Sequence, residues 1–228
     1  MAVVKRKYVV PGDLIVKGNY QVLSNAYREG DAIYSTKIGM AEIVDNKVRV
    51  IPLTGPYIPK VDDFVLGIIV DYVPLAWTVD INSFCEAFLP AQSVFGRGFN
   101  PEIHDLTERL KIGDLVAAKI VSFERGKDPM LTISGSGLGK LTSGKLVKIS
   151  PVKVPRLIGR KGSMSKMIER ITGCELTIGQ NGLVFIKGHS EGIIKAVEAI
   201  KFVEEQAHTS GLTQNIQNLL KERGEENE

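Results

Sequence analysis

The sequence predicts a multidomain chain that is mainly β in its first part and α+β in its last part. Glycine (23) and proline (10) are frequent among the 228 residues, whereas aromatic residues make up only 7%, a composition typical of short strands joined by turns. The apolar pattern is strand-like over the first two thirds of the chain and then changes to helical spacing. Hydrophobic residues (43%) and charged residues (24%) occur at ordinary levels, which excludes a disordered tail, a collagen-like fibre and a coiled coil.

The first block, residues 1–58, is predicted to form a small β domain. A tight hairpin is expected where Asp45-Asn46 separates two apolar strands, because these residue types favour two-residue turns. Pro52, Pro56 and Pro59 then mark a domain junction. The strands are expected at Tyr8–Val10, Asp13–Val16, Ala32–Ile38, Ala41–Val44 and Lys47–Pro52.

The second block, residues 59–139, restarts the strand pattern. Five strands in about 75 residues, with one long connection over residues 91–113, are typical of a small Greek-key barrel of the oligonucleotide-binding type. A glycine-rich stretch, Gly135–Gly139, is expected to be a flexible joint after the barrel. The strands are expected at Phe64–Tyr72, Ala76–Ile81, Glu86–Leu89, Leu115–Phe123 and Met130–Ser134.

The third block, residues 140–211, is predicted to follow the order β-α-α-β-β-α. Its middle helix is expected to start with Ser163 as the N-cap and to stop at Gly173. Residues 212–228 form a tail, with a short helix expected at Leu212–Lys221 before an acidic end. The remaining elements are expected at Leu146–Ile149, Pro155–Ile158, Glu175–Ile178, Leu183–Lys187 and in a long helix from Ser190.

The formal net charge of +3 is the sum of unequal parts. The four segments, in chain order, carry +3, −4, +6 and −2. Residues 140–170 hold nine basic residues and one acidic residue, Glu169. Such a local concentration of positive charge favours an anionic partner at this segment rather than over the whole surface.

The centre of that charge is the sequence Leu157-Ile-Gly-Arg-Lys-Gly162, between two helical segments. A tight G-x-x-G turn exposes backbone N–H groups and a helix N-terminus, which favour an anion, and its glycines let a sugar-phosphate backbone approach closely. The motif predicts a clamp for about four nucleotides of single-stranded nucleic acid, and the alternative is a plain helix-turn-helix corner with solvated charges. The predicted contacts are Gly159, Arg160, Lys161 and Gly162, with Lys153, Arg156, Lys166 and Arg170 extending the field.

These residues also carry a family resemblance. Residues of about 146–207 resemble a type I KH domain through the Ile-Gly-x-x-Gly core, and residues of about 60–138 resemble an S1 domain. The S1-like pieces are Asp63–Val70, Trp77–Ile81, Ala87–Pro90 and Gly113–Lys119. The segments Val10–Asp13 and Tyr27–Gly30, together with Tyr34, resemble the N-terminal domain of exosome cap subunits, and Gly179-Gln-Asn-Gly182 resembles the G-x-N-G signature of that family. The chain therefore resembles the KH-containing cap subunit of the archaeal exosome.

The resemblance implies a role in RNA decay without catalysis by this chain. Three cap subunits are expected on a hexameric ring of RNase PH-like subunits, and the sequence leaves open whether they mix with the other cap subunit. Residues 1–58 would dock on the ring, the S1 domains would surround the pore, and the KH domains would lie outside and capture single-stranded RNA. The resemblance implies that Gly159–Gly162 contacts RNA and that Gly179–Gly182 supports the contact between the S1 and KH domains. A tight turn with positive φ at Asn181 or Gly182 is the simpler reading of the second loop.

The S1-like block departs from RNA-binding S1 surfaces, because Pro90 stands where a histidine is usual and the block carries a charge of −4. Local RNA contacts are expected from Arg97, Arg125 and Lys127, with solvated loop charges as the alternative. Trp77 shares an apolar face with Val79 and Ile81 and is expected in the core, with RNA contact as the alternative.

Other functional classes have weaker support. Gly139–Lys145 follows most of a P-loop pattern, but Leu146 replaces the Ser/Thr that would bind Mg²⁺, and a strand is expected to follow. No catalytic residues, cofactor or metal site are expected, since the histidines are scattered and the two cysteines are not in a paired motif. A free-standing S1/KH transcription or translation factor remains the alternative function. With no apolar run long enough to cross a bilayer, we expect no membrane association and a cytoplasmic location.

Overall fold

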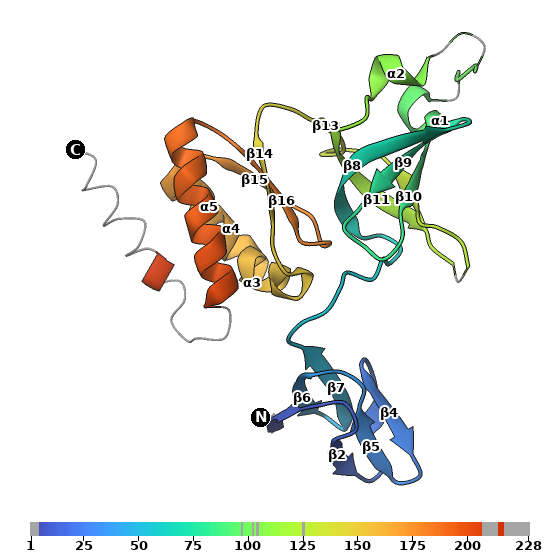
Figure 1. Cartoon of the computed structure of the whole chain (residues 1–228). Helices are drawn as coiled ribbons and strands as arrows, with labels where there is room; N and C mark the ends of the chain where they lie inside the picture. The colour runs from blue at the N-terminus through green and yellow to red at the C-terminus, as the bar shows by residue number, and fades with distance from the viewer. Residues whose placement is uncertain are drawn as a thin grey trace. The chain divides into compact units, whose positions relative to one another are not determined.

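The computed structural model describes residues 5–96, 98–101, 103, 105–124, 126–206 and 214–216. The chain divides into two compact units after Gly55 (Figure 1), next to the predicted proline-rich junction. The barrel and the β-α-α-β-β-α region both belong to the second unit. The domain boundaries at 58, 139 and 211 stay predictions.

The first unit consists of two small, mainly antiparallel sheets, with the strand orders β1-β6-β7-β3 and β2-β5-β4. The predicted hairpin between β6 and β7 is confirmed, because Asp45 and Asn46 have φ values of 46° and 64° and Val44 pairs with Lys47. Strands β3 and β4 are additions to the prediction. The strands are β1 (Lys5–Val9), β2 (Leu14–Lys17), β3 (Gln21–Val22), β4 (Ala26–Glu29), β5 (Ala32–Ser35), β6 (Gly39–Val44) and β7 (Lys47–Pro52).

The predicted five-stranded barrel is confirmed. It closes because β12 pairs with β10 on one side and with β11 on the other. Trp77 is fully buried and its Nε1 donates to the carbonyl of Leu110 at 3.2 Å, which confirms its place in the core. The strands are β8 (Phe64–Val73), β9 (Ala76–Asp80), β10 (Ala87–Pro90), β11 (Leu115–Ser122) and β12 (Met130–Thr132), and the long connection contains α1 (Ala91–Phe95) and α2 (Leu106–Arg109).

A sixth strand, β13 (Gly139–Leu141), extends the barrel sheet. It pairs with the first half of β11, from Leu115↔Leu141 to Ala117↔Gly139. The last residue of the expected flexible joint is therefore part of a strand. The P-loop-like segment runs from β13 to the next strand, β14 (Lys145–Lys148), so it is not followed by the helix N-terminus that a phosphate cradle needs.

The last region has the predicted order β-α-α-β-β-α. Two helices and the long C-terminal helix cover one face of a sheet with the order β14-β16-β15 (Figure 1). Ile168 and Ile200 from the helices pack with Val184 and Ile186 from the sheet, and all four are fully buried. After β14, the elements are α3 (Val154–Ile158), α4 (Ser163–Thr172), β15 (Glu175–Ile178), β16 (Leu183–Lys187) and α5 (Ser190–Glu205), with 3₁₀ turns at Pro151–Lys153 and Arg160–Gly162.

The prediction that Ser163 is the N-cap of α4 is wrong. Ser163 is the first helical residue, and Gly162 precedes it with φ 77° and without a side chain to cap the helix. The chain enters α4 from a left-handed conformation, which glycine adopts without steric cost and serine does not. The predicted stop at Gly173 is confirmed, since Gly173 has φ 66° and its N–H donates to the carbonyl of Glu169.

The two domains of the second unit share a buried contact. The face of the KH-like sheet that is not covered by helices packs on the outside of the barrel, where Leu183 and Phe185 meet Leu66 and Ala117. All four are at most 5% exposed. The barrel and this region therefore have a common apolar core.

The predicted tail helix at Leu212–Lys221 lies outside the described residues, apart from Gln214–Ile216, which is helical. Ile216 is fully buried and belongs to the same apolar cluster as Ile149 and Ile200. None of the helices in the described part of the chain is long and apolar enough to cross a membrane.

Candidate nucleic-acid interface

The G-x-x-G loop connects α3 to α4 through left-handed backbone. Gly159 ends α3 with φ 72°, and its N–H donates to the carbonyl of Pro155 at 3.0 Å. Lys161 and Gly162 follow with φ values of 53° and 77°. Glycine adopts a positive φ without the strain that an L side chain incurs, so the two glycines of the motif suit this turn, while Lys161 is held there with strain.

The two glycines of the loop have different surroundings. A Cβ atom on Gly159 would lie 2.8 Å from the backbone nitrogen and the Cβ of Met164, whereas one on Gly162 would meet only flexible side-chain atoms, with Lys166 Cε at 3.7 Å. Gly159 therefore allows α4 to pack closely against the end of α3. Gly162 leaves an open surface in front of the first turn of α4.

That open surface is electropositive. The N–H of Ser163 donates to the carbonyl of Arg160. The N-cap of α4, Gly162, has no side chain that could accept hydrogen bonds from the other first-turn N–H groups, so the end of the helix and its dipole favour an anion. The Arg160 and Lys161 side chains are exposed beside it, and Lys166 follows one turn into the helix. A phosphate group fits this combination of backbone donors and flexible cations.

The other predicted cations of this region divide into two groups. Arg156 on α3 and Arg170 on α4 are exposed and remain able to contribute to the field. Lys153 is half-buried, and its Nζ donates to the backbone carbonyl of Glu204 at 2.7 Å, near the end of α5. The ammonium group of Lys153 thus stabilises the C-terminal turn of a helix, and its predicted RNA contact remains a prediction.

For the RNA contacts predicted on the barrel, the structure shows no link to the loop Gly159–Gly162. Lys127 is exposed after β11 and forms an ion pair with Glu124 at 2.6 Å. Arg97 and Arg125 lie outside the described residues. The structure therefore leaves the three barrel positions as predictions.

The second glycine loop, Gly179–Gly182, is buried against the barrel. Asn181 is fully buried, and its Nδ2 donates to the carbonyls of Leu66 and Ile81, each at 2.7 Å. Its Oδ1 accepts from the N–H of Leu66 at 3.3 Å. Asn82 Nδ2 donates to the carbonyl of Asn181 at 2.7 Å, so the backbone of this residue is also bonded to the barrel.

Two further details describe the same loop. The Gln180 N–H donates to the carbonyl of Phe64 at 2.9 Å, and Gly182 has the positive φ (84°) that the turn reading predicted. These hydrogen bonds confirm that the loop Gly179–Gly182 supports the contact between the barrel and the KH-like domain. The tight turn at Gly182 gives the loop the conformation in which it forms them.

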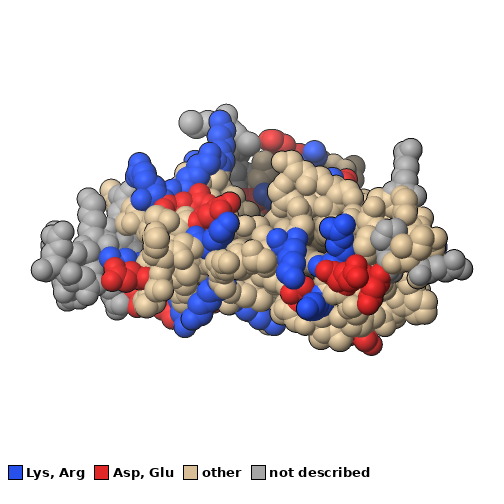
Figure 2. All heavy atoms as spheres, turned by 90° about the horizontal axis from the view of Figure 1, so that it is seen from above, with Lys and Arg blue, Asp and Glu red and all other residues tan. Residues whose placement is uncertain are grey.

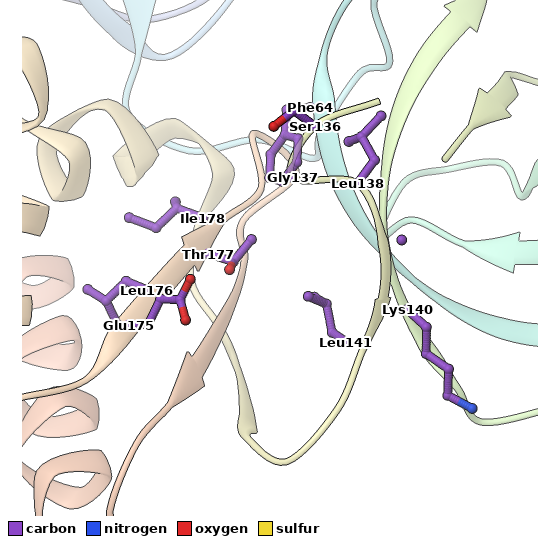
Figure 3. A pocket seen from close by; sticks show the side chains of 11 residues that line it. Phe64, Ser136, Gly137, Leu138, Lys140, Leu141, Glu175, Leu176, Thr177 and Ile178 are labelled. Carbon is purple, nitrogen blue, oxygen red and sulfur yellow. The ribbon is translucent and has the colours of Figure 1, made fainter. Parts of the chain in front are cut away.

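A cavity of about 510 Å³ lies between the two domains of the second unit (Figure 3). One wall is β15 (Glu175–Ile178), and the other is the segment 136–141 with Phe64. Lys140 is the basic residue of this lining, and its ammonium group is paired with the carboxylate of Asp114. The walls thus offer little attraction for phosphate, and no motif in the sequence indicates this cavity.

Positive charge does not form a continuous patch on the face of the molecule that Figure 2 shows. On the face seen in Figure 2, Lys and Arg side chains are interspersed with Asp and Glu side chains. No group of three or more His, Cys, Asp or Glu side chains in the described residues is placed to hold a metal ion. The loop between α3 and α4 is therefore the strongest candidate site.

Comparisons with known proteins agree with this arrangement. Residues 6–54 match the family model described as the exosome RNA binding protein RRP4 N-terminal domain, and residues 144–192 match that of the KH domain. The chain is also similar to a solved structure of an exosome complex RNA-binding protein, with 42% identity and a TM-score of 0.72, covering 76% of this chain and all of that one.

Curated relatives are similar over nearly the full length. The exosome complex component Rrp4 of Nitrosopumilus maritimus is 51% identical over 222 residues, which cover 97% of this chain and 98% of the relative. The protein of the same name from Thermococcus kodakarensis is 43% identical over 221 residues, covering 96% and 86%. The chain belongs to the Rrp4 family of exosome complex components.

Proposed function

We propose that this chain is a non-catalytic RNA-binding subunit of an exosome 3′–5′ exoribonuclease complex, which captures single-stranded RNA and guides its 3′ end into the catalytic ring. The observation that carries the proposal is the loop Gly159–Gly162, whose open left-handed turn, uncapped α4 N-terminus and exposed Arg160 and Lys161 suit a phosphate backbone. Contacts of this kind position a nucleic acid without reading its bases. Binding is therefore expected to show modest sequence selectivity.

The first unit is proposed to dock on RNase PH-like ring subunits, with three copies of the chain in a complex, alone or mixed with the other cap subunit. Support comes from the outward face of the sheet β1-β6-β7-β3. Arg6, Glu42 and Arg49 stand opposite one another on three strands, and both guanidinium groups donate to the buried carboxylate of Glu42. The hydrogen bond from Arg49 and that from Arg6 lower the pKa of Glu42, although burial opposes them.

The same face also presents apolar surface, since Tyr8 is 67% exposed two residues after Arg6 on β1. An exposed aromatic next to partly exposed arginines is typical of protein interfaces. The barrel is proposed to guide RNA rather than capture it, because its block carries the net charge of −4.

The first test measures RNA binding by the purified chain over a range of salt concentrations. The double variant Arg160→Ala/Lys161→Ala is expected to weaken binding of single-stranded RNA at least tenfold. It should also reduce the slope of log K against log salt by about 1.4, which corresponds to two lost phosphate contacts on a single strand. The matched control is Lys187→Ala/Lys201→Ala, which removes the same charge from β16 and α5. If affinity and slope are unchanged in the loop variant, the loop is not the RNA clamp.

The second test addresses the assembly. The chain is expected to co-purify with RNase PH-like ring subunits and to accelerate decay of an RNA substrate when it is added to the ring. If the chain is stable but does not bind the ring subunits, the result would instead favour the alternative function, a free-standing S1/KH transcription or translation factor.

A further inference from the structure

The outward face of the sheet β1-β6-β7-β3 contains a hollow of about 310 Å³. The opposite face of the same sheet is core, since Val9, Ala41 and Val50 are at most 3% exposed. Because side chains alternate along a strand, the two faces carry separate sets of residues. The lining of the hollow consists of Leu23, Glu42, Val44, Asp45, Lys47 and Arg49.

The Glu42 carboxylate holds two guanidinium groups on this face. Its side chain is only 5% exposed, whereas those of Arg6 and Arg49 are 59% and 51% exposed. Arg6 donates from Nε and Nη2 to Oε1 at 3.2 and 3.0 Å, and Arg49 Nε donates to Oε2 at 2.8 Å. The carboxylate is therefore an internal anchor, and the guanidinium groups are what the face presents to a partner.

The triad Arg6–Glu42–Arg49 has unused charge and unused donors. Two guanidinium groups and one carboxylate give it a charge of +1. Each guanidinium has five N–H donors, and within the described residues the hydrogen bonds of both groups go to Glu42. Lys47 and Asp45, which also line the hollow, have opposite charges and leave the positive charge of the triad in place.

These features suit a carboxylate on another protein. A fixed, planar guanidinium group binds a carboxylate through two parallel hydrogen bonds. Tyr8 on β1 and Leu23 after β3 lie on either side of the triad and are 67% and 46% exposed. Exposed apolar and aromatic residues around arginines are characteristic of protein interfaces.

We propose that Arg6 and Arg49, held in place by Glu42, form a binding site for an aspartate or glutamate side chain of an RNase PH-like ring subunit. This inference rests on the docking proposed above and adds the chemistry of the contact. Tyr8 and Leu23 would exclude water from the bound carboxylate, which strengthens the attraction between the charges. The triad then determines affinity for the ring more than the other charges of the first unit do.

The test measures binding of the full-length chain to the purified ring by isothermal titration calorimetry. The neutral triad, Arg6→Met/Glu42→Gln/Arg49→Met, removes all three charges together, so that no unpaired carboxylate is left buried. It is expected to fold and to bind the ring about thirtyfold more weakly than the wild type. Arg49→Lys keeps the charge but loses the planar fork, and it should bind about fivefold more weakly.

The matched control is Lys7→Ala, which changes the net charge of the chain by the same amount as the neutral triad. Lys7 is exposed and alternates with Arg6 and Tyr8 on β1, so its side chain does not belong to the outward face. This variant should bind the ring within about twofold of the wild type. Thermal unfolding of every variant shows that a loss of binding is not a loss of folding.

An inverted triad, Arg6→Glu/Glu42→Arg/Arg49→Glu, identifies the group on the partner. It keeps internal ion pairs and changes the charge of the triad from +1 to −1. The wild-type ring should bind it about a hundredfold more weakly. A ring in which one acidic residue of the docking surface is changed to lysine should recover about tenfold of that loss. If no such change restores binding, the ligand is not a carboxylate and the inference is wrong. If the inverted triad does not fold, the neutral triad and Arg49→Lys decide.

Two further results would overturn the inference. In the first, the neutral triad binds the ring as tightly as the wild type, so the docking stands but does not use this site. In the second, the neutral triad weakens RNA binding by the isolated chain as much as Arg160→Ala/Lys161→Ala does, so the face binds RNA instead. The proposed docking itself fails by a different result, namely a wild-type chain that does not bind the ring.

Discussion

The KH region contains two loops with the same G-x-x-G spacing and opposite environments. Gly159–Gly162 is an open turn with exposed cations, and a Cβ atom at Gly162 would meet only flexible side-chain atoms. In Gly179–Gly182, Asn181 is fully buried, and a Cβ atom on Gly182 would lie 2.3 Å from the carbonyl oxygen of Ile149. The first loop is available to a ligand, and the second is already bound to the barrel.

The two central residues of each loop account for this difference. The long charged side chains of Arg160 and Lys161 cannot be buried without a partner, so the loop that carries them faces solvent. Asn181 has both a donor and an acceptor on a short side chain, which match the peptide groups of Leu66 and the carbonyl of Ile81. The spacing of the glycines thus determines the turn, while the residues between the glycines determine whether the loop faces solvent or packs on the barrel.

The largest expected effect is on the buried loop. Asn181→Ala leaves the carbonyls of Leu66 and Ile81 without their donor and should lower the free energy of unfolding by about 3 kcal/mol. RNA affinity at low temperature should change less than twofold, because the other loop is intact. Denaturant unfolding and anisotropy titrations measure the two quantities.

The matched control for this variant is Gln180→Ala. Gln180 is exposed and uses only its backbone N–H to contact Phe64, so its loss should cost less than about 0.5 kcal/mol. Equal stabilities of the Asn181 and Gln180 variants would contradict the assigned role of Asn181.

Much of the fold could be predicted because local patterns were strong. The bounds of β15 and β16 agree with the prediction, since each strand is a short apolar run between glycines. Strand β3 has two residues and β13 begins in a glycine-rich stretch, so neither has a periodic signal. Both depend on partners far along the chain, β7 and β11.

The site was predictable in its centre and less so at its edges. The loop glycines and their cations follow from a contiguous motif. The hydrogen bond from Lys153 to the carbonyl of Glu204 joins residues that are 51 positions apart in the sequence. The hydrogen bond from the Leu176 N–H to Glu169 can be predicted only when the positions of α4 and β15 in space are known. The role of Asn181 was expected only from the family resemblance, because the turn chemistry alone allowed a plain turn.

A smaller effect separates the two glycines of the exposed loop. Gly159→Ala combines a strained φ of 72° with a clash against the backbone of Met164 and should lower the free energy of unfolding by about 2 kcal/mol. Gly162→Ala introduces strain at φ 77° without a clash and should cost about 1 kcal/mol. Thermal unfolding of both variants measures the difference, and the reverse order of stabilities would show that the open surface is assigned to the wrong glycine.

The smallest expected effect concerns Lys161, whose φ of 53° is unfavourable for a residue with a side chain. Lys161→Gly should raise the free energy of unfolding by about 0.5 kcal/mol, because relief of the left-handed strain exceeds the added entropy of the unfolded chain. The same variant should reduce the salt slope of RNA binding by about 0.7, the value for one phosphate contact. Lys161→Gln is the control, since it removes the charge and keeps the strain, and it should reduce the slope without raising stability. A more stable protein that binds RNA less well would show that the exposed loop keeps a strained residue for its ligand, whereas a Lys161→Gly variant with unchanged slope would remove Lys161 from the clamp.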